Sequence, residues 1–232
     1  IIKTALDTWQ RLDIVVNNAG ILRDKSVSNM SPEDFDAVLK VHLYGGFNCS
    51  RHALPVMREQ GYGRIINIVS SAGLRGNFGQ ANYGSAKAGL MGLTFVIAVE
   101  HMKGNAEGKY SITANALAPA GMTRMVGAIP GMEGQPVPPE MNPDLNGPMV
   151  AFLASPQAKH VNGQIFGRRG YAYTLFQTPK PIAAMFKEGG LSAEDIAKNF
   201  DAAFADHLNV PGIPMTAAMK EAMAKAAAAK KG

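Results

Sequence analysis

Cysteine is nearly absent from this chain: Cys49 is the single one among 232 residues. A lone cysteine excludes an internal disulfide and a metal site built from cysteines, so we expect no bound metal. No apolar run approaches the roughly 18 residues that a membrane-spanning helix needs. The chain does not open on the charged and then apolar residues of a signal peptide, and we therefore expect a cytoplasmic protein.

Acidic residues are fewer than basic ones, with 18 Asp and Glu against 23 Lys and Arg, so the net charge is +5. Basic charge attracts phosphates, whether in nucleic acid or in a small molecule. Aromatic residues make up 7% of the chain and are not interleaved with basic ones, which disfavours binding of single strands. Much of the basic excess lies at Lys220, Lys225, Lys230 and Lys231. We therefore expect a solvated basic tail and no nucleic-acid partner.

Short apolar runs alternate with amphipathic segments along most of the chain. Such runs are typical of strands buried on both faces, and they span residues 12–16, 64–71, 112–117 and 163–166. Between them we expect helices, including one continuous helix at 32–60 and another at 82–102. Strands that alternate with helices predict an α/β fold with a doubly wound parallel sheet. We expect this domain to cover residues 1–170, and a partly helical extension to cover 171–232.

Two helix starts carry a capping signature. Ser31 precedes Pro32 and stands three residues before Asp34, and Ser192 stands three residues before Asp195. A serine hydroxyl in this position accepts a hydrogen bond from the backbone N–H three residues on. We therefore predict that helices begin directly after each serine.

Tyr83 and Lys87 are four residues apart in a predicted helix, so both side chains project from one face. A free tyrosine has a pKa of roughly 10, and a neighbouring ammonium lowers that pKa by favouring the phenolate. Ser70 comes at the end of a predicted strand, where open α/β sheets bind their ligands. The pattern predicts that Tyr83 donates a proton to a ketone or takes one from an alcohol. Ser70 is expected to hold the oxygen of that substrate.

A turn of small residues, Asn17-Asn18-Ala19-Gly20, follows the first predicted strand and either stabilises the sheet, lets a ligand approach, or does both. A Tyr-x-x-x-Lys pair alone is often a solvated helix pair, whereas this turn followed by Ser70, Tyr83 and Lys87 is far more specific. The ordered set resembles the short-chain dehydrogenase/reductase family. The resemblance implies a Rossmann-type fold and hydride transfer with NAD or NADP. It also implies cofactor contacts from Asn17, Ala19, Gly20, Tyr83, Lys87, Pro119 and Thr123.

His42 lies where the family usually has an asparagine that completes the catalytic set and a water relay. Together, Val41-His42-Leu43 and Gly76–Tyr83 look like a narrower group: the dehydrogenase part of peroxisomal multifunctional enzyme type 2 and its bacterial single-domain relatives. This resemblance covers about residues 1–185 and implies oxidation of (3R)-3-hydroxyacyl-CoA thioesters to 3-oxoacyl-CoA with NAD. A hydroxysteroid or another alcohol remains open as the substrate, as does a truncated, non-catalytic chain that serves as a scaffold.

The family's glycine-rich phosphate loop does not occur in this sequence. In such folds the loop lies in the first βα turn and holds the pyrophosphate at a helix N-terminus. We therefore expect two βα units of about 30 residues each to precede Ile1. For the same reason we expect the chain as written to bind NAD or NADP only weakly.

The predicted helices at 32–60 and 82–102 carry more apolar and small residues than one sheet face needs. Members of the family pair these helices across a two-fold axis, as symmetric dimers commonly do. The resemblance therefore implies a homodimer or homotetramer, with an acyl thioester or a steroid as the small-molecule partner.

Overall fold

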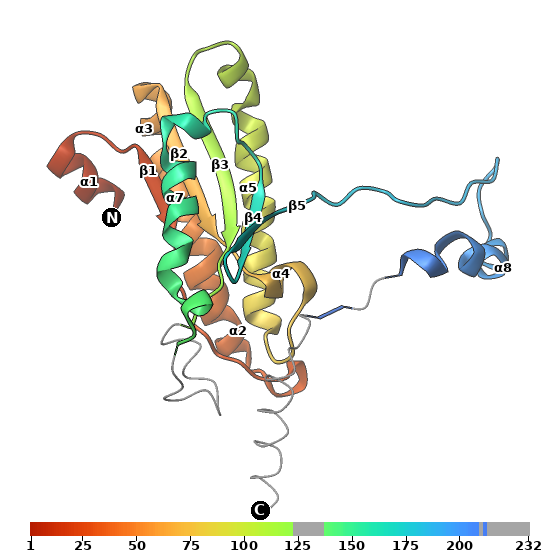
Figure 1. Ribbon diagram of the computed structural model, residues 1–232. Coiled ribbons are helices and arrows are strands. Elements are labelled where there is room, and N and C mark those ends of the chain that lie inside the picture. Colours follow the sequence, from red (N-terminus) through yellow and green to blue (C-terminus); the bar gives the residue numbers. More distant parts are fainter. Residues whose placement is uncertain (123–136, 209–210, 213–232) are drawn as a thin grey trace, which may run out of the picture. The chain divides into compact units, whose positions relative to one another are not determined.

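The computed structural model describes residues 1–122, 137–208 and 211–212, and a five-stranded sheet forms its centre (Figure 1). The strands lie side by side in chain order. They are β1 (Ile14–Asn17), β2 (Tyr62–Ile68), β3 (Ser111–Ala118), β4 (Ile165–Arg169) and β5 (Ala172–Phe176). The first four are parallel, which confirms the predicted sheet, whereas β5 is antiparallel to β4.

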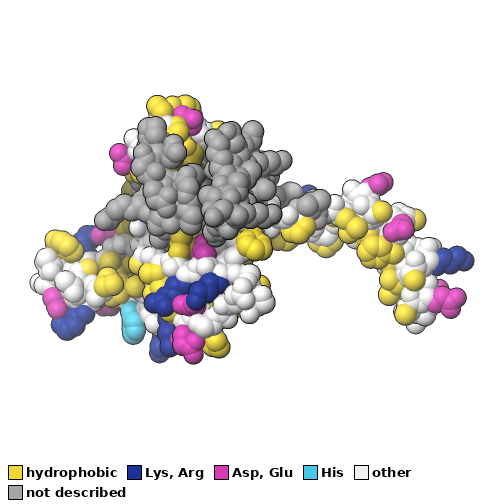
Figure 2. All heavy atoms as spheres, turned by 90° about the horizontal axis from the view of Figure 1, so that it is seen from below, with side chains coloured by type: hydrophobic (Ala, Val, Ile, Leu, Met, Phe, Trp, Pro, Cys, Tyr) yellow, Lys and Arg dark blue, Asp and Glu magenta, His cyan; other side chains and the backbone are white. Residues whose placement is uncertain are grey.

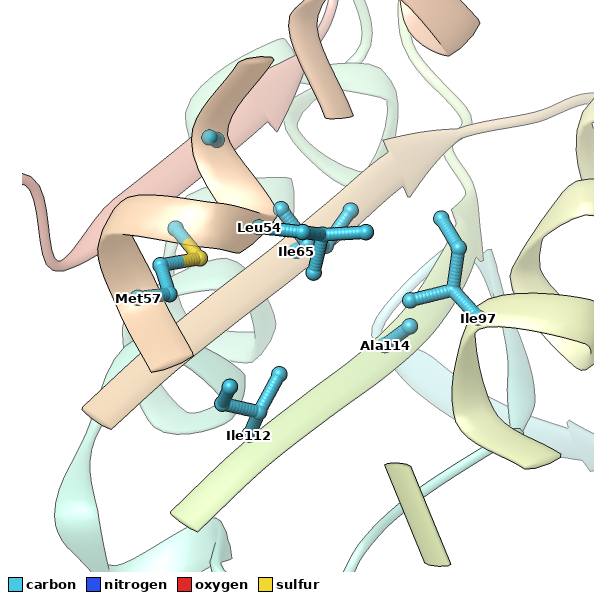
Figure 3. Close-up of a cluster of buried hydrophobic side chains, with 7 residues drawn as sticks. Leu54, Met57, Ile65, Ile97, Ile112 and Ala114 are labelled. Atoms are coloured by element: carbon cyan, nitrogen blue, oxygen red, sulfur yellow. The ribbon is translucent and has the colours of Figure 1, made fainter. Parts of the chain in front are cut away.

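Helices pack on both faces of this sheet. They are α1 (Ile2–Trp9), α2 (Pro32–Leu39), α3 (Gly45–Gln60), α4 (Ser71–Arg75), α5 (Ala81–Ala106) and α7 (Gly147–Ala154), and α8 (Ala193–Phe204) follows later in the chain. On one face Met57 of α3 and Ile97 of α5 join Ile65 of β2 in the cluster of Figure 3. On the other face Leu153 of α7 packs with Ile66. Successive side chains of a strand point to opposite faces. Because helices cover both faces, β2 is buried along nearly its whole length.

The long helix predicted at 32–60 is interrupted. Helix α2 ends at Leu39, a π-helical turn occupies Lys40–Tyr44, and α3 continues from Gly45. The prediction of one continuous helix is wrong in this detail, because the spacing of apolar residues does not distinguish an α-turn from a single wider turn. Such π-turns inside helices are frequent at functional sites, and this one contains the buried His42.

Both predicted helix starts are confirmed. Ser31 Oγ accepts a hydrogen bond of 3.1 Å from the backbone N–H of Asp34, and α2 begins directly after this serine. Ser192 and Asp195 cap each other reciprocally, and α8 begins directly after Ser192. None of the described helices is long and apolar enough to cross a membrane.

The chain divides into compact units, one of which contains Ile1–Phe176 and the other Gln177–Pro211. The sheet continues past Gly170, which has a φ of +58° and starts the two-residue turn between β4 and β5. Glycine adopts this left-handed conformation without steric penalty. The sequence did not predict β5, because four of its five side chains are exposed and leave no buried alternation to detect.

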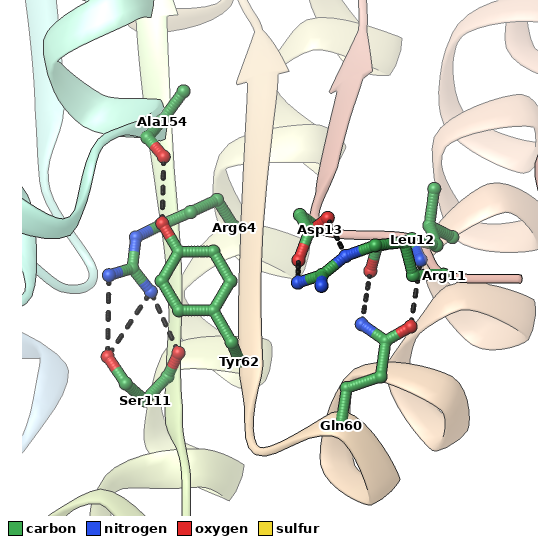
Figure 4. A network of polar contacts seen from close by, with 8 residues as sticks. All are labelled: Arg11, Leu12, Asp13, Gln60, Tyr62, Arg64, Ser111 and Ala154. Atoms are coloured by element: carbon green, nitrogen blue, oxygen red, sulfur yellow. Dashed lines mark hydrogen bonds and ion pairs between the residues drawn. The ribbon is translucent and has the colours of Figure 1, made fainter. Parts of the chain in front are cut away.

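Polar contacts hold the amino ends of the strands together (Figure 4). Gln60, the last residue of α3, exchanges hydrogen bonds of 2.8 and 2.9 Å with the backbone of Leu12, just before β1. Arg64 of β2 is buried and donates a hydrogen bond of 2.8 Å to the carbonyl oxygen of Ser111 in β3. The opposite, carboxyl ends of the strands are where open α/β sheets bind ligands.

Candidate active site

Ser70 and Tyr83 meet at the carboxyl end of β2. Ser70 follows this strand and caps α4, since its Oγ accepts a hydrogen bond of 3.1 Å from the backbone N–H of Ala72. Tyr83 lies in the first turn of α5, close enough to Ser70 for the serine hydroxyl to act on the pKa of the phenol. The two helices approach so closely that a Cβ at Gly73 would lie 2.7 Å from the backbone nitrogen of Ala88. Glycine at this position therefore lets α4 bring Ser70 to α5.

Lys87, one turn further along α5, is almost completely buried, with 2% of its surface exposed. Its Nζ donates a hydrogen bond of 2.5 Å to the carbonyl oxygen of Ile68, the last residue of β2. Among the described residues this carbonyl is the only hydrogen-bond partner of the ammonium, which has three N–H donors. Burial disfavours the charged form and lowers the pKa of Lys87 to about 8. The Nζ atom lies 5.5 Å from the centre of the Tyr83 ring.

Burial keeps the Tyr83 phenol protonated. It raises the pKa of Tyr83 above the usual value, the Ser70 hydroxyl opposes this shift, and the charge on Asp24 adds to it. The prediction that Lys87 lowers this pKa is wrong for the described structure. The loss of hydration is the largest effect on the Tyr83 pKa, and Lys87 is not among its causes. The Lys87 ammonium is bonded to the end of β2 rather than to the phenol. A buried, protonated phenol is suited to donate a proton.

His42 projects from the π-helical turn to the Tyr83 ring. The two ring centroids are 5.1 Å apart, with an interplanar angle of 84°. Nε2 lies 3.1 Å from the backbone nitrogen and 2.9 Å from the carbonyl oxygen of Ile21, whereas Nδ1 is buried and has no hydrogen-bond partner among the described residues. Burial lowers the pKa of His42 and the charge of Lys87 lowers it further, against an opposing effect of the Ile21 backbone. The neutral imidazole is therefore favoured.

The turn after β1 is held by polar contacts as well as by small residues. Asn17 Nδ2 donates a hydrogen bond of 2.8 Å to Asn67 Oδ1, and Asn67 Nδ2 donates one of 2.9 Å to Thr94 Oγ1. Gly20 lies against His42, because a Cβ at this glycine would be 2.4 Å from the Cε1 atom of the imidazole. The side chain of Asn17 thus stabilises the sheet, and Gly20 makes room for His42.

Pro119 follows β3 at the same edge of the sheet as Ser70. The register of β2 and β3 pairs Ile68 with Leu117, so the residues two positions further on lie on neighbouring segments. Thr123 lies outside the described residues, and its predicted contact with a cofactor stays a prediction.

Asn82 and Asp34 position the start of α5, a role that the sequence did not predict for either residue. Asn82 Nδ2 donates hydrogen bonds to the carbonyl oxygens of Arg23 (2.9 Å) and Asp34 (3.2 Å), and Asn82 Oδ1 accepts one of 2.7 Å from the backbone N–H of Tyr83. Hydrogen bonds from Lys25 and Arg23 lower the pKa of the Asp34 carboxyl to about 2. Figure 2 shows Lys and Arg side chains gathered around acidic ones on the face seen from below. The sequence signal that could have indicated this role is the polar residue Asn82 directly before Tyr83.

An open groove of about 460 Å³ lies beside the start of α5. The segment 76–81 and Val27 line it, and the side chains of Phe78 and Val27 are largely exposed. Ser70, Tyr83 and Lys87 do not line this groove. The groove is therefore separate from the place where these three side chains meet.

We expect His42→Asn to weaken the pH dependence of stability. Burial lowers the His42 pKa in the folded chain below the usual 6.5, so the unfolded chain takes up the proton first as the pH falls. The contribution of the neutral imidazole to stability is therefore complete above about pH 6.5 and is lost as the pH falls toward the lowered pKa. Urea unfolding at a series of pH values between 8 and 5 measures this dependence.

His101→Asn is the matched control. His101 is also buried, burial also lowers its pKa, and its Nε2 accepts a hydrogen bond of 3.0 Å from Arg58 Nε. Each substitution should remove part of the pH dependence, but only the change at His42 touches Tyr83. Identical pH profiles of stability in His42→Asn and the parent would contradict a buried neutral imidazole at this position.

Residues 1–132 match the family model described as short chain dehydrogenase. Over 171 residues the chain is 42% identical to peroxisomal multifunctional enzyme type 2 of Mus musculus, covering 72% of this chain and 21% of that protein. Over 180 residues it is 43% identical to the hydroxyacyl-CoA dehydrogenase ChsB1 of Mycobacterium tuberculosis, covering 72% of this chain and 55% of that protein. The chain therefore spans only about half the length, or less, of these two curated relatives.

The fold agrees with a solved structure as well. The crystal structure of a short chain dehydrogenase from Mycobacterium avium aligns with a TM-score of 0.76 at 34% identity, covering 92% of this chain and 72% of that one. The family model and the Mus musculus relative confirm the similarity to peroxisomal multifunctional enzyme type 2 that the sequence predicted.

Proposed function

Because the chain belongs to the short-chain dehydrogenase/reductase family, we propose that it interconverts (3R)-3-hydroxyacyl and 3-oxoacyl thioesters with NAD. Its family makes it an oxidoreductase that uses NAD or NADP. The thioester is supported by the relative named hydroxyacyl-CoA dehydrogenase. The observation that carries the proposal is the meeting of Ser70, Tyr83 and the buried Lys87 at the carboxyl end of β2.

In this proposal Tyr83 moves the proton. A nicotinamide bound at this edge of the sheet would supply or accept the hydride. In reduction Tyr83 donates its phenol proton to the ketone oxygen, and in oxidation its phenolate takes the proton of the alcohol. The Ser70 hydroxyl donates a hydrogen bond to the same oxygen, whereas the Lys87 ammonium stays bonded to the end of β2. Because burial raises the Tyr83 pKa, reduction starts with the proton already in place.

The residues at this edge of the sheet fit a dinucleotide. The Lys87 ammonium has N–H donors beyond the one that binds the end of β2, and ribose hydroxyls are suitable acceptors. The small residues Ala19 and Gly20, and Pro119 after β3, would let a ligand come close to the backbone. Asn17 would contribute its backbone alone, because its side-chain amide is bonded within the sheet.

We propose that His42 assists Tyr83 in the place of the family's asparagine. Its imidazole contacts the Tyr83 ring, and its buried Nδ1 lacks a partner among the described residues. Buried polar atoms are normally hydrogen-bonded, directly or through ordered water, so this atom suits a water in a proton relay toward Lys87. Turnover by His42→Leu equal to that of the parent would contradict this role.

The test of the proposed function compares substrates at equal concentration with the protein as the cell makes it. NADH formation is followed with (3R)-3-hydroxydecanoyl-CoA, with its (3S) enantiomer and with a hydroxysteroid. We expect kcat/KM for the (3R) thioester to exceed that for the other two by about tenfold or more, because a misplaced hydroxyl leaves Tyr83 and Ser70 unpaired. A preference for the steroid, or no turnover with NAD or NADP, would contradict the proposal.

We further propose a homodimer or homotetramer. Val96, Val99 and Met102 are spaced three residues apart on α5, share one helix face and are each more than half exposed. An exposed apolar stripe of this kind is suited to contact with a second copy of the chain. A monomeric mass in light scattering at micromolar concentration would count against it.

The cytoplasmic location expected from the sequence also remains a proposal.

A further inference from the structure

Arg168 is a buried cation that lacks the usual counter-charge. It lies near the carboxyl end of β4 and has 6% of its surface exposed. No carboxylate pairs with it among the described residues, although buried charges are normally paired. Its exposed neighbour Arg169 has the same side chain without this burial. The burial of Arg168 therefore needs a physical reason.

The guanidinium is satisfied by neutral oxygens from several segments. An arginine has five N–H donors in a rigid planar fork, and here it donates five hydrogen bonds. They run from Nε to Asn146 Oδ1 (2.9 Å), from Nη1 to the carbonyl oxygens of Glu140 (2.9 Å) and Gly170 (2.5 Å), and from Nη2 to those of Ala120 and Asn142 (3.2 Å). With every donor used, the side chain joins chain segments rather than binding a ligand itself.

Asn146 and a backbone contact strengthen the same junction. Asn146 Oδ1 accepts a hydrogen bond of 3.2 Å from the backbone N–H of Ala120, and its Nδ2 donates one of 3.0 Å to the Ala120 carbonyl oxygen. The backbone N–H of Met122 donates to the Met141 carbonyl oxygen at 2.8 Å. Arg168 thus lies at the centre of a contact between the segments 120–122 and 140–146.

This junction borders the proposed reaction centre. The register of β3 and β4 pairs Ala118 with Gly167, so Arg168 follows at the level of Pro119. Pro119 in turn lies on the segment next to Ser70, because β2 and β3 are paired up to their carboxyl ends. The backbone of Ala120 is therefore only one residue beyond the position that faces Ser70.

We propose that Arg168 is a positioning residue for the reaction, which holds the backbone at Ala120 so that the substrate oxygen meets Ser70 and Tyr83. The inference rests on the proposed function for its substrate. A misplacement of about 1 Å at a reacting centre can lower the rate by about 100-fold. Lysine keeps the charge but offers three N–H donors on one atom, so it cannot reproduce a planar fork with five donors.

The test compares Arg168→Lys with Arg169→Lys, its exposed neighbour. In Arg168→Lys we expect kcat to fall by about 10- to 100-fold while KM for the (3R)-3-hydroxyacyl thioester changes by less than about threefold, because orientation is lost and most substrate contacts remain. Arg169→Lys should behave like the parent. In Arg168→Gly, millimolar guanidinium should restore part of kcat, whereas equal sodium chloride should not. An unchanged kcat in Arg168→Lys would overturn the inference.

A second measurement does not depend on the substrate. Amide hydrogen exchange at Ala120 and Met122 should speed up in Arg168→Lys and stay unchanged in Arg169→Lys. Unchanged exchange would overturn the inference even if the enzyme assay works, whereas an inactive parent would contradict the proposed function alone. If Arg168→Lys does not fold, Asn146→Ala removes one of the five acceptors and should lower kcat in the same direction by a smaller factor. Full activity of Asn146→Ala together with unchanged exchange would again overturn it.

Discussion

Tyr83→Phe is expected to lower turnover by about 10²- to 10⁴-fold, the usual effect of removing a general acid–base group. The change deletes the hydroxyl that exchanges a proton with the substrate and leaves the ring to pack against His42. Cofactor affinity should therefore stay close to that of the parent. Steady-state rates with the (3R)-3-hydroxyacyl thioester, together with NADH titration by fluorescence, measure the two quantities separately.

Tyr110→Phe is the matched control for this experiment. Tyr110 precedes β3 at the amino ends of the strands and packs against His101, with ring centroids 5.6 Å apart. Loss of its hydroxyl should leave turnover unchanged, because it is far along β3 from the carboxyl end. Activity of Tyr83→Phe within a few-fold of the parent would show that Tyr83 does not transfer the proton.

Ile65→Ala is expected to lower the free energy of unfolding by about 2–5 kcal/mol, as other large-to-small changes in a packed core do. Ile65 has no exposed surface and lies between α3 and α5, in contact with the cluster that includes Met57 and Ile97. Its truncation removes apolar contacts on that side of the sheet and leaves a cavity. Urea unfolding monitored by circular dichroism measures the change.

Ile14→Ala provides the comparison at a half-exposed site. Ile14 pairs with Arg64 in the next strand over, but 43% of its surface is exposed. The same truncation should therefore destabilise the fold much less than the change at Ile65. Equal effects at the two sites would mean that the cluster between α3 and α5 is not the core that stabilises this domain.

The sequence by itself determined the parallel sheet and the helix starts. Apolar runs mark strands because β2 and β3 are covered on both faces, and the capping serines Ser31 and Ser192 act on backbone groups three residues away. Spacing also determined that Tyr83 and Lys87 share a helix face. These features depend on neighbours along the chain, which is why a local pattern reveals them.

Tertiary structure decided the environment of the same residues. The pKa of Tyr83 rises instead of falling because burial outweighs the opposing effect of the Ser70 hydroxyl. His42 contacts Tyr83 from a π-turn, and Gly20 leaves space for its ring. A local sequence pattern does not predict how far a side chain is buried. It also does not predict which distant segments come into contact.

Arg168 is the clearest example of a role that the local sequence does not predict. In the sequence it is one of two adjacent arginines, and nothing in the local pattern separates it from Arg169. Its five acceptors come from Ala120, Glu140, Asn142, Asn146 and Gly170. Four of these lie more than twenty positions away in the chain. The pairing of β3 with β4 brings Ala120 to the guanidinium, and contacts between the segments 120–122 and 140–146 bring the other three. Sequence determined which side chains carry the chemistry, whereas folding decided which distant backbone groups hold them in place, because hydrogen bonds and burial act through space.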